Sequence, residues 1–509
     1  MGAKTDPFVV HRALVGQGEE LEASRIGQDG PIPPHEAVQP SPLCDPLVAG
    51  AQIQMVGVGQ DQAGAQLAQL VGGNGLDRGL GAHGRKYRGK DRAMRCVKYA
   101  GPGAPGGRLQ FEGEGGHVFR GRHGGHYTQP IARRGHACIM ASEPQHETWV
   151  QVDLAAIENN VRVATRGTRA RIMAVLKANA YGHGAVPVAR AALGAGAAWC
   201  GVARLDEALE LRRAGLDCPI LVLGPVPAGR LQQAVSEGIS LTVFTQDHVE
   251  AAAAAGRAAG TEARLHLKVD TGMARLGLDP QEAAPLARTI QAATGARLEG
   301  MSTHFARADE EDTEPTAHQL AQFDELLQAM DSVGLRPAWV HAANSAATAT
   351  RSGAHFDLVR LGVAVYGLHP SAVCKLPDSY RPALSWKTRL VQVRRLPPDR
   401  GVSYGHVYRT QAEERVGTAL VGYADGFRRE PGNLALVGGR RVPVIGRVCM
   451  DMCVLQLDQV PEARPGDEVV LIGSQAQESI RAEEVAERWG TINYEVTCGI
   501  GARVPRVYA

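Results

Sequence analysis

Between residues 171 and 366, eight short apolar runs alternate with amphipathic segments, at intervals of about 20 to 40 residues. Strands that alternate with helices pair in parallel through right-handed crossovers. Eight such units in about 200 residues predict an α/β fold, a closed (β/α)8 barrel whose active site would lie at the C-terminal ends of its strands. The predicted strands are residues 172–176, 199–202, 219–223, 240–244, 265–269, 298–304, 339–343 and 358–366.

Amphipathic segments nearly disappear after about residue 375. Valine-rich runs joined by glycine or proline turns predict strands there, together with one helix at residues 482–489. We therefore predict a barrel domain at residues 140–375 and a mostly β domain at residues 376–509. The predicted strands of the second domain are residues 384–396, 416–423, 435–437, 442–445, 448–457 and 468–472.

The first 139 residues are built differently, since they hold 27 of the 61 glycines. No helical or strand period is sustained there for more than about two turns, which predicts disorder. A second interpretation is an extension from a start codon placed too far upstream, because Met140 directly precedes the first well-patterned segment. Both interpretations leave residues 1–139 without chemistry.

Two patterns in this segment imitate binding sites. Gly101, Gly103 and Gly106 match the dinucleotide glycine pattern, but prolines interrupt them and no apolar strand precedes them. The histidines at positions 117, 123, 126 and 136 could bind a metal only if a scaffold held them in place. We therefore predict neither a nucleotide site nor a metal site.

Charge and hydropathy exclude several classes of protein. Lysine and arginine number 55 against 53 aspartate and glutamate, and the resulting charge of +2 argues against binding nucleic acid through its phosphates. No run of 18 apolar residues occurs and the first residues lack the layout of a secretory signal, so we expect no membrane partner and a cytoplasmic location. Nine scattered cysteines favour reduced thiols.

Lys177 begins the sequence K-A-N-A-Y-G-H-G at residues 177–184, directly after the first predicted barrel strand. A lysine at a strand end is often a plain surface residue. Here the apolar strand and the expected site face favour partial burial, which would lower the pKa of the amine. Lys177 is therefore a candidate for forming a Schiff base.

This segment resembles the alanine racemase family, and further motifs of that family follow in the same order, so that the resemblance covers residues 149–507. It implies a pyridoxal-phosphate enzyme of fold type III that interconverts L-alanine and D-alanine and supplies D-alanine for peptidoglycan. It also implies a homodimer whose active sites are shared between the subunits. The further motifs are residues 266–277, 302–306, 341–345, 356–362, 401–405, 422–426 and 446–451.

The resemblance assigns seven residues to the cofactor pyridoxal 5′-phosphate. Lys177 would form the Schiff base, and Tyr181 would hold the phosphate together with Ser345. Arg360 would hydrogen-bond the pyridine nitrogen, with His304 in support. Because a guanidinium only donates hydrogen bonds, that nitrogen would stay unprotonated. The cofactor residues so implied are Lys177, Tyr181, His304, Ser345, Arg360 and the backbone of Gly362 and Val363.

The resemblance also assigns three residues to the substrate, and it leaves the roles of two others undecided. The resemblance implies that the planar fork of Arg275 contacts the substrate carboxylate, which also receives the backbone N–H of Met450. Tyr423 would line the mouth of the pocket. Lys268 matches a lysine that is carbamylated in some members. Ala502 stands where some relatives carry a phosphate-binding tyrosine, which would remove one hydrogen bond to the phosphate.

Racemisation removes a proton from one face of Cα and delivers another to the opposite face, so two bases on opposite sides are the economical solution. The resemblance implies that Tyr404 is the second base, and on that basis we assign Lys177 to the D-alanine proton and Tyr404 to the L-alanine proton. Neutral lysine and tyrosinate are both disfavoured in water at neutral pH, so the site has to lower both pKa values.

Three other functions compete with this one. A pyridoxal-phosphate-binding protein without turnover would have a similar single barrel but no second domain carrying the S-Y-G sequence at residues 403–405. A decarboxylase of basic amino acids would share the barrel-plus-β architecture but not these motifs. A racemase for another amino acid, such as serine, would share both.

Overall fold

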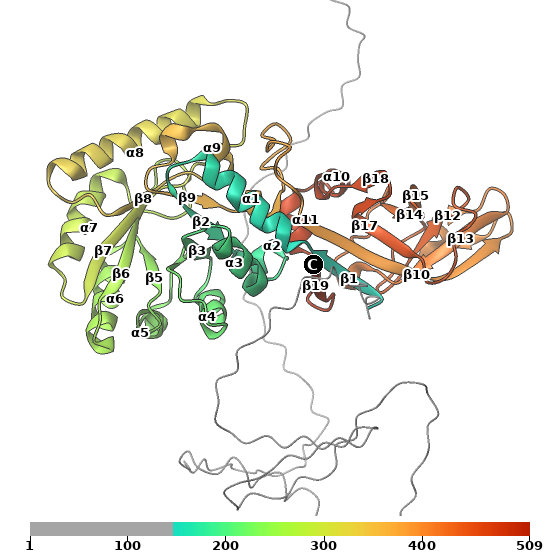
Figure 1. The fold of residues 1–509 in the computed structure, drawn as a ribbon, viewed down its shortest axis with the longest axis horizontal. Coiled ribbons are helices and arrows are strands. Elements are labelled where there is room, and N and C mark those ends of the chain that lie inside the picture. Colours follow the sequence, from blue (N-terminus) through green and yellow to red (C-terminus); the bar gives the residue numbers. More distant parts are fainter. Residues whose placement is uncertain (1–145) are drawn as a thin grey trace, which may run out of the picture. The chain divides into compact units, whose positions relative to one another are not determined.

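A ring of eight parallel strands forms the first sheet of the protein, whose computed structural model describes residues 146–509 (Figure 1). These strands are hydrogen-bonded in the order β8-β7-β6-β5-β4-β3-β2-β9. Backbone hydrogen bonds from Arg360 to Ala343 (2.9 Å) and from Asp357 to Val340 (3.1 Å) bring β9 back to the β8 side. The predicted (β/α)8 barrel is confirmed. Its strands are β2 (Arg171–Val175), β3 (Trp199–Val202), β4 (Ile220–Val222), β5 (Ser240–Val243), β6 (Ala263–Lys268), β7 (Ala296–Ser302), β8 (Trp339–His341) and β9 (Leu358–Leu361).

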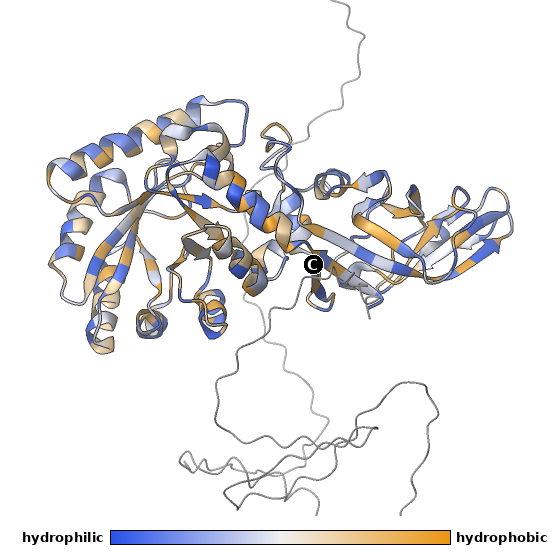
Figure 2. Ribbon diagram, in the orientation of Figure 1, coloured by the Kyte–Doolittle hydropathy of each residue, from blue (hydrophilic) through white to orange (hydrophobic). Residues whose placement is uncertain are grey.

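Helices lie outside this ring of strands (Figure 1). In α8 the buried residues Thr316, Gln319, Phe323, Leu326 and Met330 recur every three or four positions, so one face packs against the barrel and the other is hydrophilic (Figure 2). No helix within residues 146–509 is long and apolar enough to cross a bilayer. The helices are α1 (Leu154–Gly167), α2 (Lys177–Tyr181), α3 (Ala185–Gly194), α4 (Leu205–Arg213), α5 (Leu231–Ser236), α6 (Gln246–Ala259), α7 (Pro280–Ala292), α8 (Glu314–Ser332) and α9 (Ser345–Thr350).

A second, nine-stranded sheet contains most of the chain after residue 383, which confirms the predicted β-rich part. Its order is β18-β17-β14-β15-β16-β13-β10-β1-β19, and β17 also pairs with β10. Two short strands, β11 (Gly401–Val402) and β12 (Tyr408–Arg409), form a separate hairpin. The remaining elements are β10 (Leu384–Leu396), β13 (Glu414–Ala419), β14 (Leu434–Val437), β15 (Arg440–Ile445), β16 (Cys453–Gln456), β17 (Glu468–Gln475), β18 (Glu478–Ile480), α10 (Ala482–Arg488), α11 (Asn493–Cys498) and β19 (Arg506–Tyr508).

The first strand of the described chain, β1 (Thr148–Val152), belongs to this second sheet. It pairs antiparallel with β10 and parallel with β19, and its Trp149, Val150 and Val152 are buried. The domain predicted for residues 140–375 therefore begins with residues that hydrogen-bond to strands of the other predicted domain. Hydrophobic alternation predicts a strand but does not tell which sheet the strand joins.

Three predicted strands end differently in the structure. The run at residues 416–423 gives β13, which stops at Ala419, and Tyr423 begins a 3-10 helix. The run at residues 358–366 was expected to be one strand, yet β9 stops at Leu361. At Gly362 the backbone turns to ψ −100°, and Val363–Tyr366 form a 3-10 helix. The run at residues 448–457 contains only the short strand β16, preceded by an irregular loop. The predictions of disorder or of an upstream extension concern residues 1–139, which lie outside the described residues.

A left-handed turn follows the first barrel strand directly. Ala178, Asn179, Ala180 and Tyr181 have φ values between 52° and 54°, a conformation that costs an L-residue about 1–2 kcal/mol. Hydrogen bonds hold the turn in place, because Ala178 N donates to Glu207 Oε1 (2.7 Å) and Asn179 Oδ1 accepts from the backbone that begins α3 (2.8 Å). Local sequence preference does not explain four such residues in a row, so tertiary contacts impose them.

Glycines allow this turn to pack directly on the end of the chain. A Cβ at Gly182, where φ is +84°, would lie 2.1 Å from the carbonyl oxygen of Thr497 in α11. A Cβ at Gly184 would lie 1.9 Å from Oη of Tyr508 in β19. Arg506 Nε donates to the Gly182 carbonyl oxygen (3.0 Å). The loop that carries Lys177 is thus supported by the last elements of the chain.

Removal of β1 should destabilise the second sheet. A chain that begins at residue 154 loses three buried side chains, each contributing about 1.5–3 kcal/mol, so its free energy of unfolding should fall by about 5 kcal/mol relative to a chain that begins at residue 140. Urea denaturation of both chains measures the difference. Equal midpoints would show that β1 contributes nothing to stability.

Replacement of Ala178 by glycine should stabilise the protein. Glycine adopts positive φ without steric cost, which should raise the free energy of unfolding by about 0.5–1 kcal/mol after the extra entropy of the unfolded chain is subtracted. The matched control is Ala254→Gly, at an exposed position of the right-handed helix α6, which should lower it by about 1 kcal/mol. A decrease for both variants in the same urea titration would contradict this account of the turn.

Candidate active site

A cavity of about 620 Å³ opens at the C-terminal ends of the barrel strands, where the sequence predicted the site. Its walls come from the loops after β2, β6, β7 and β8 and from β9. Eight of the predicted site residues line it together: Lys177, Tyr181, Arg275, His304, Ser345, Arg360, Gly362 and Val363.

Lys177 lies two residues beyond β2, and its side chain reaches into the cavity. Its Nζ is 5.9 Å from the centre of the Tyr181 ring. Enclosure by the cavity walls, followed by the positive charge of Arg275, lowers the pKa of Lys177 below its ordinary value. The neutral, nucleophilic amine is therefore more available here than in a free lysine.

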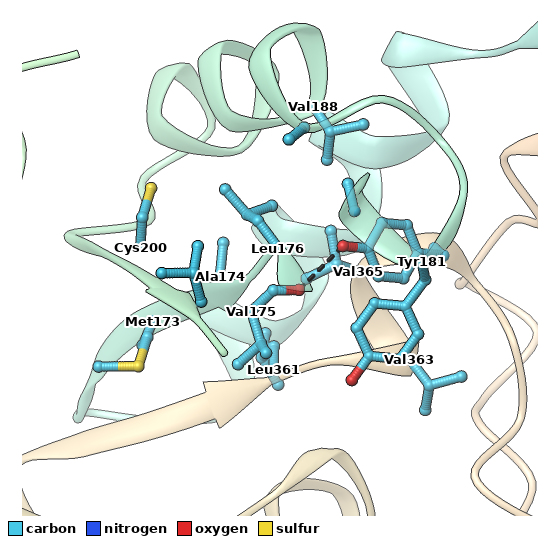
Figure 3. Close-up of a cluster of buried hydrophobic side chains, with 14 of the residues drawn as sticks. Met173, Ala174, Val175, Leu176, Tyr181, Val188, Cys200, Leu361, Val363 and Val365 are labelled. Carbon is cyan, nitrogen blue, oxygen red and sulfur yellow. Dashed lines mark hydrogen bonds between the residues drawn. The ribbon is translucent and has the colours of Figure 1, made fainter. Parts of the chain in front are cut away.

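Tyr181 packs in a cluster of buried side chains (Figure 3), where it contacts other aromatic rings at tilted angles. Its ring centre is 4.9 Å from that of Tyr366, which in turn is 4.4 Å from the ring of His183. Tyr366 Oη donates to the carbonyl oxygen of Val175 at the end of β2 (2.9 Å). Burial raises the pKa of Tyr181, so its phenol stays protonated and can donate a hydrogen bond into the cavity.

Ser345 supplies a second hydroxyl donor. Its Oγ accepts hydrogen bonds from the backbone N–H of Gly362 (2.9 Å) and of Ala364 (3.2 Å). Because both bonds use its oxygen as acceptor, the hydroxyl hydrogen remains free to point at a ligand. The absence of a side chain at Gly362 also matters, since a Cβ there would lie 2.6 Å from Tyr181 Oη.

Arg360 lies in the lining of the cavity, and the two terminal nitrogens of its guanidinium make five hydrogen bonds, while none of the described residues accepts from its Nε. Nη1 donates to His341 Nδ1 (3.0 Å) and to the His341 carbonyl oxygen (2.9 Å). Nη2 donates to His304 Nδ1 (2.9 Å) and to the carbonyl oxygens of Thr303 (3.0 Å) and Ala342 (2.9 Å). Burial lowers the pKa of Arg360 to about 10. This value is still well above neutral pH, so the guanidinium stays charged.

Basic side chains outnumber acidic ones in the lining of this cavity. Two lysines and two arginines line it (Lys177, Lys268, Arg275 and Arg360), whereas its carboxylates are Asp309 and Glu495. Burial, followed by the charge of Arg360, lowers the pKa of Lys268 well below its ordinary value. The same causes lower the pKa of His304 well below its own. The cavity is therefore suited to a ligand that carries several negative charges.

The other three predicted site residues, Tyr404, Tyr423 and Met450, do not line this cavity. They are 68%, 46% and 54% exposed, and they lie on three loops that touch one another. Tyr423 N donates to the Cys449 carbonyl oxygen (3.0 Å), and Ser403 Oγ donates to the Arg447 carbonyl oxygen. Tyr404 and Tyr423 line a second, shallower hollow with Arg429 and Val448. A single chain therefore does not bring the two predicted bases into one cavity.

Residues of α11 were missed at the sequence level. Tyr494 lines the cavity with its ring centre 6.0 Å from that of Tyr181, and Cys498 lines it beside Lys177. Ala502, at the position where some relatives carry a tyrosine, is exposed and outside the cavity lining. Tyr494 therefore offers a phenol for the phosphate hydrogen bond that Ala502 cannot make. The amphipathic period over six residues is too short to have predicted α11.

Comparison with known proteins identifies the two halves of the described chain. The model of the alanine racemase N-terminal domain matches residues 152–370, and that of the C-terminal domain matches residues 383–508. The alanine racemase of Symbiobacterium thermophilum is 46% identical over 372 residues, which are 72% of this chain and 99% of that protein. The alanine racemase of Geobacillus kaustophilus is 47% identical over 375 residues, covering 72% and 95%.

Solved structures agree with these matches. The crystal structure of alanine racemase from Bacillus anthracis with bound L-Ala-P has a TM-score of 0.68 at 44% identity and covers 72% of this chain and 95% of that chain. Alanine racemase from the D-cycloserine producer Streptomyces lavendulae has a TM-score of 0.69 at 40% identity and covers 72% and 98%. With both domain models matched and full-length relatives above 40% identity, the chain belongs to the alanine racemase family.

Proposed function

We propose that this chain is a pyridoxal-phosphate-dependent racemase that interconverts L-alanine and D-alanine and supplies D-alanine for peptidoglycan. One observation carries the proposal within the structure. A lysine with a lowered pKa shares one cavity with hydroxyl donors and with buried and exposed arginines. Family membership and the alanine-derived ligand named for the Bacillus anthracis structure support alanine as the substrate.

The residues of the cavity fit pyridoxal 5′-phosphate. Hydroxyl donors from Tyr181, Ser345 and Tyr494 lie on one side, where the phosphate would be held near the backbone of Gly362 and Val363. Lys177 would supply the amine for the Schiff base. When bound, this cofactor withdraws electrons from the substrate and so makes the hydrogen on Cα acidic.

Arg360 determines what its partner on the cofactor ring has to be. Five acceptors engage its Nη1 and Nη2, so Nε–H is the donor that remains for a ligand, and a guanidinium offers only donors. A ring nitrogen placed against it would therefore accept a hydrogen bond and remain unprotonated. We assign His304 to support Arg360, because its Nδ1 accepts from Nη2 and its lowered pKa keeps it neutral.

Arg275 is assigned to the substrate carboxylate. It is exposed to the cavity beside Lys177, and its planar fork matches a carboxylate in a bidentate manner. Its loop is held by Asp270, whose Oδ1 accepts from the backbone of Gly272 (2.9 Å) and Met273 (2.8 Å). The carboxylate position is thereby set relative to the amine of Lys177.

We infer that the second base comes from another copy of the chain in a homodimer. Lys177 takes or gives the proton of D-alanine, and Tyr404 of the second copy acts on the opposite face. This assignment explains why Tyr404, Tyr423 and Met450 are exposed in one chain, since a second copy would bury them over its own cavity. Met450 would add its backbone N–H to the carboxylate site, and Tyr423 would line the mouth. We place the enzyme in the cytoplasm, without a nucleic-acid or membrane partner.

Mixing two inactive variants tests the function and the shared site together. Lys177→Ala and Tyr404→Phe should each lose racemisation, but co-expression should restore about a quarter of the parental activity, because half of the dimers combine both chains and keep one intact site. The assay follows D-alanine formed from L-alanine with D-amino-acid oxidase, with L-serine in parallel.

The matched control combines Lys177→Ala with Arg360→Ala. Both residues line the same cavity of one chain, so no mixed dimer can assemble an intact lining on either side, and activity should not return. A mixture of the first pair that stays as inactive as its components would refute the shared site. Conversion of L-serine in place of L-alanine, or release of CO2 from lysine, would refute the substrate.

Replacement of Gly362 by alanine should weaken cofactor binding. The added Cβ would sit 2.6 Å from Tyr181 Oη, and the stacked Tyr181 ring has no room to retreat. Loss of one hydrogen bond to the phosphate should raise the dissociation constant of pyridoxal phosphate about tenfold. Absorbance titration of the cofactor-free protein measures it. Gly353→Ala, with nothing within 4 Å of its Cβ, is the control, and equal constants for both variants would contradict this role of Gly362.

A further inference from the structure

A chain of buried side chains leads from Arg360 into the interior of the barrel. Arg360 Nη1 contacts His341 Nδ1 at 3.0 Å, and His341 Nε2 contacts His266 Nδ1 at 3.0 Å. His266 Nε2 then contacts Glu299 Oε2 at 3.3 Å. These four residues come from β9, β8, β6 and β7, and each is less than 9% exposed.

The two ends of the chain require the same direction of donation. A guanidinium only donates, so His341 Nδ1 has to accept, and the proton of a neutral His341 sits on Nε2. His266 Nδ1 then accepts a hydrogen bond from His341 Nε2. The proton of a neutral His266 therefore sits on Nε2, which faces Glu299. An ionised carboxylate only accepts, so this end agrees with the first. Every bond in the chain is therefore satisfied in one pattern of tautomers.

Glu299 is held as an anion by its neighbours. Burial by itself would raise its pKa, but hydrogen bonds from His266 and Ser240 together with nearby charge, that of Arg297 included, outweigh burial, and the pKa lies below its ordinary value. Ser240 Oγ donates to Oε2, and Arg297 Nη2 donates to Oε1 (3.0 Å). The negative charge thus lies at the inner end of the chain, and the positive charge of Arg360 lies at the cavity end.

The barrel makes room for this chain at Gly300. A Cβ at this position of β7 would lie 2.4 Å from His266 Nδ1 and 2.7 Å from the Trp339 carbonyl oxygen. On another side the ring of Trp199 packs edge-on to His266, with centres 5.5 Å apart. His266 is confined between these groups, so its ring has little freedom to leave the hydrogen bonds at its two nitrogens.

We propose that Glu299 is a positioning residue for the reaction, acting through His266 and His341 to hold the Arg360 guanidinium charged and oriented toward the cofactor ring. This inference rests on the proposed function, because Arg360 needs a cofactor to act upon. Among residues 146–509, no carboxylate lies within 4 Å of Arg360. A buried cation without a compensating anion is costly, and two neutral imidazoles transmit the polarity of the Glu299 carboxylate to it.

The first test needs neither cofactor nor turnover. In the full-length chain labelled with 15N-histidine, His266 and His341 should both carry their proton on Nε2, with ring N–H resonances protected from exchange with water. Each resonance is assigned by its disappearance when that histidine is replaced by asparagine. A proton on Nδ1 of either ring, or an imidazolium at either position, would overturn the proposal.

The second test removes the charge of the carboxylate. In Glu299→Gln the His266 N–H proton should move upfield, because a neutral acceptor makes a weaker hydrogen bond. The absorption maximum of the bound cofactor should shift and kcat should fall about tenfold in both directions, as is typical for residues that orient a catalytic group. KM for alanine should change less than about twofold, because Arg275 lies outside the chain of hydrogen bonds.

The matched control is Glu414→Gln, which neutralises an equally buried carboxylate, bonded to Tyr408 and Gln456 in the second sheet. Glu414→Gln should lose about as much stability as Glu299→Gln, but it should leave the cofactor spectrum and kcat unchanged. Parental kcat and spectrum in Glu299→Gln, or equal effects of both variants, would overturn the proposal. If the parental protein neither bound pyridoxal phosphate nor racemised alanine, the proposed function would fail. The histidine tautomers measured by NMR would still show whether the hydrogen bonds from Arg360 to Glu299 form as proposed.

Discussion

The buried guanidinium of Arg360 is the group on which the rest of the site depends. Its backbone N–H joins β9 to the residues just after β8, and its side chain satisfies five acceptors from the last residue of β8 and from the loops after β7 and β8. Because a buried guanidinium without acceptors is costly, those loops are held where its hydrogens point. The same residue, Arg360, therefore helps to close the barrel and to fix the geometry of the cavity floor.

Strained backbone and several basic side chains surround that floor, and contacts with neighbouring elements hold them in place. The left-handed residues 178–181 place Lys177 and Tyr181 on one side of the cavity, and α11 and β19 pack against the turn that follows. Burial and the charges of Arg275 and Arg360 lower the pKa values of Lys177 and Lys268, so that an anionic ligand would stabilise the charges in this cavity. Sites that bind and activate a ligand often store unfavourable local energy in this way.

Much of the fold and half of the site follow from local sequence patterns. The eight apolar runs predicted the eight barrel strands because parallel strands are buried on both faces and read as continuous apolar segments. Lys177, His304 and Arg360 were placed at strand ends because each directly follows or interrupts such a run. The roles assigned to them, and to Tyr404 and Met450, depend on the resemblance to a family and stay predictions.

By itself, the sequence determined the order of strands and helices, the β-rich end of the chain and the motifs at the strand ends, since each depends on neighbours along the chain. Only the tertiary structure decided that β1 joins the second sheet, that Tyr494 lines the cavity and that Tyr404 does not. It also decided that Glu299 and Arg360 lie at two ends of one hydrogen-bonded chain. These features depend on contacts between residues far apart in sequence, which no local period encodes.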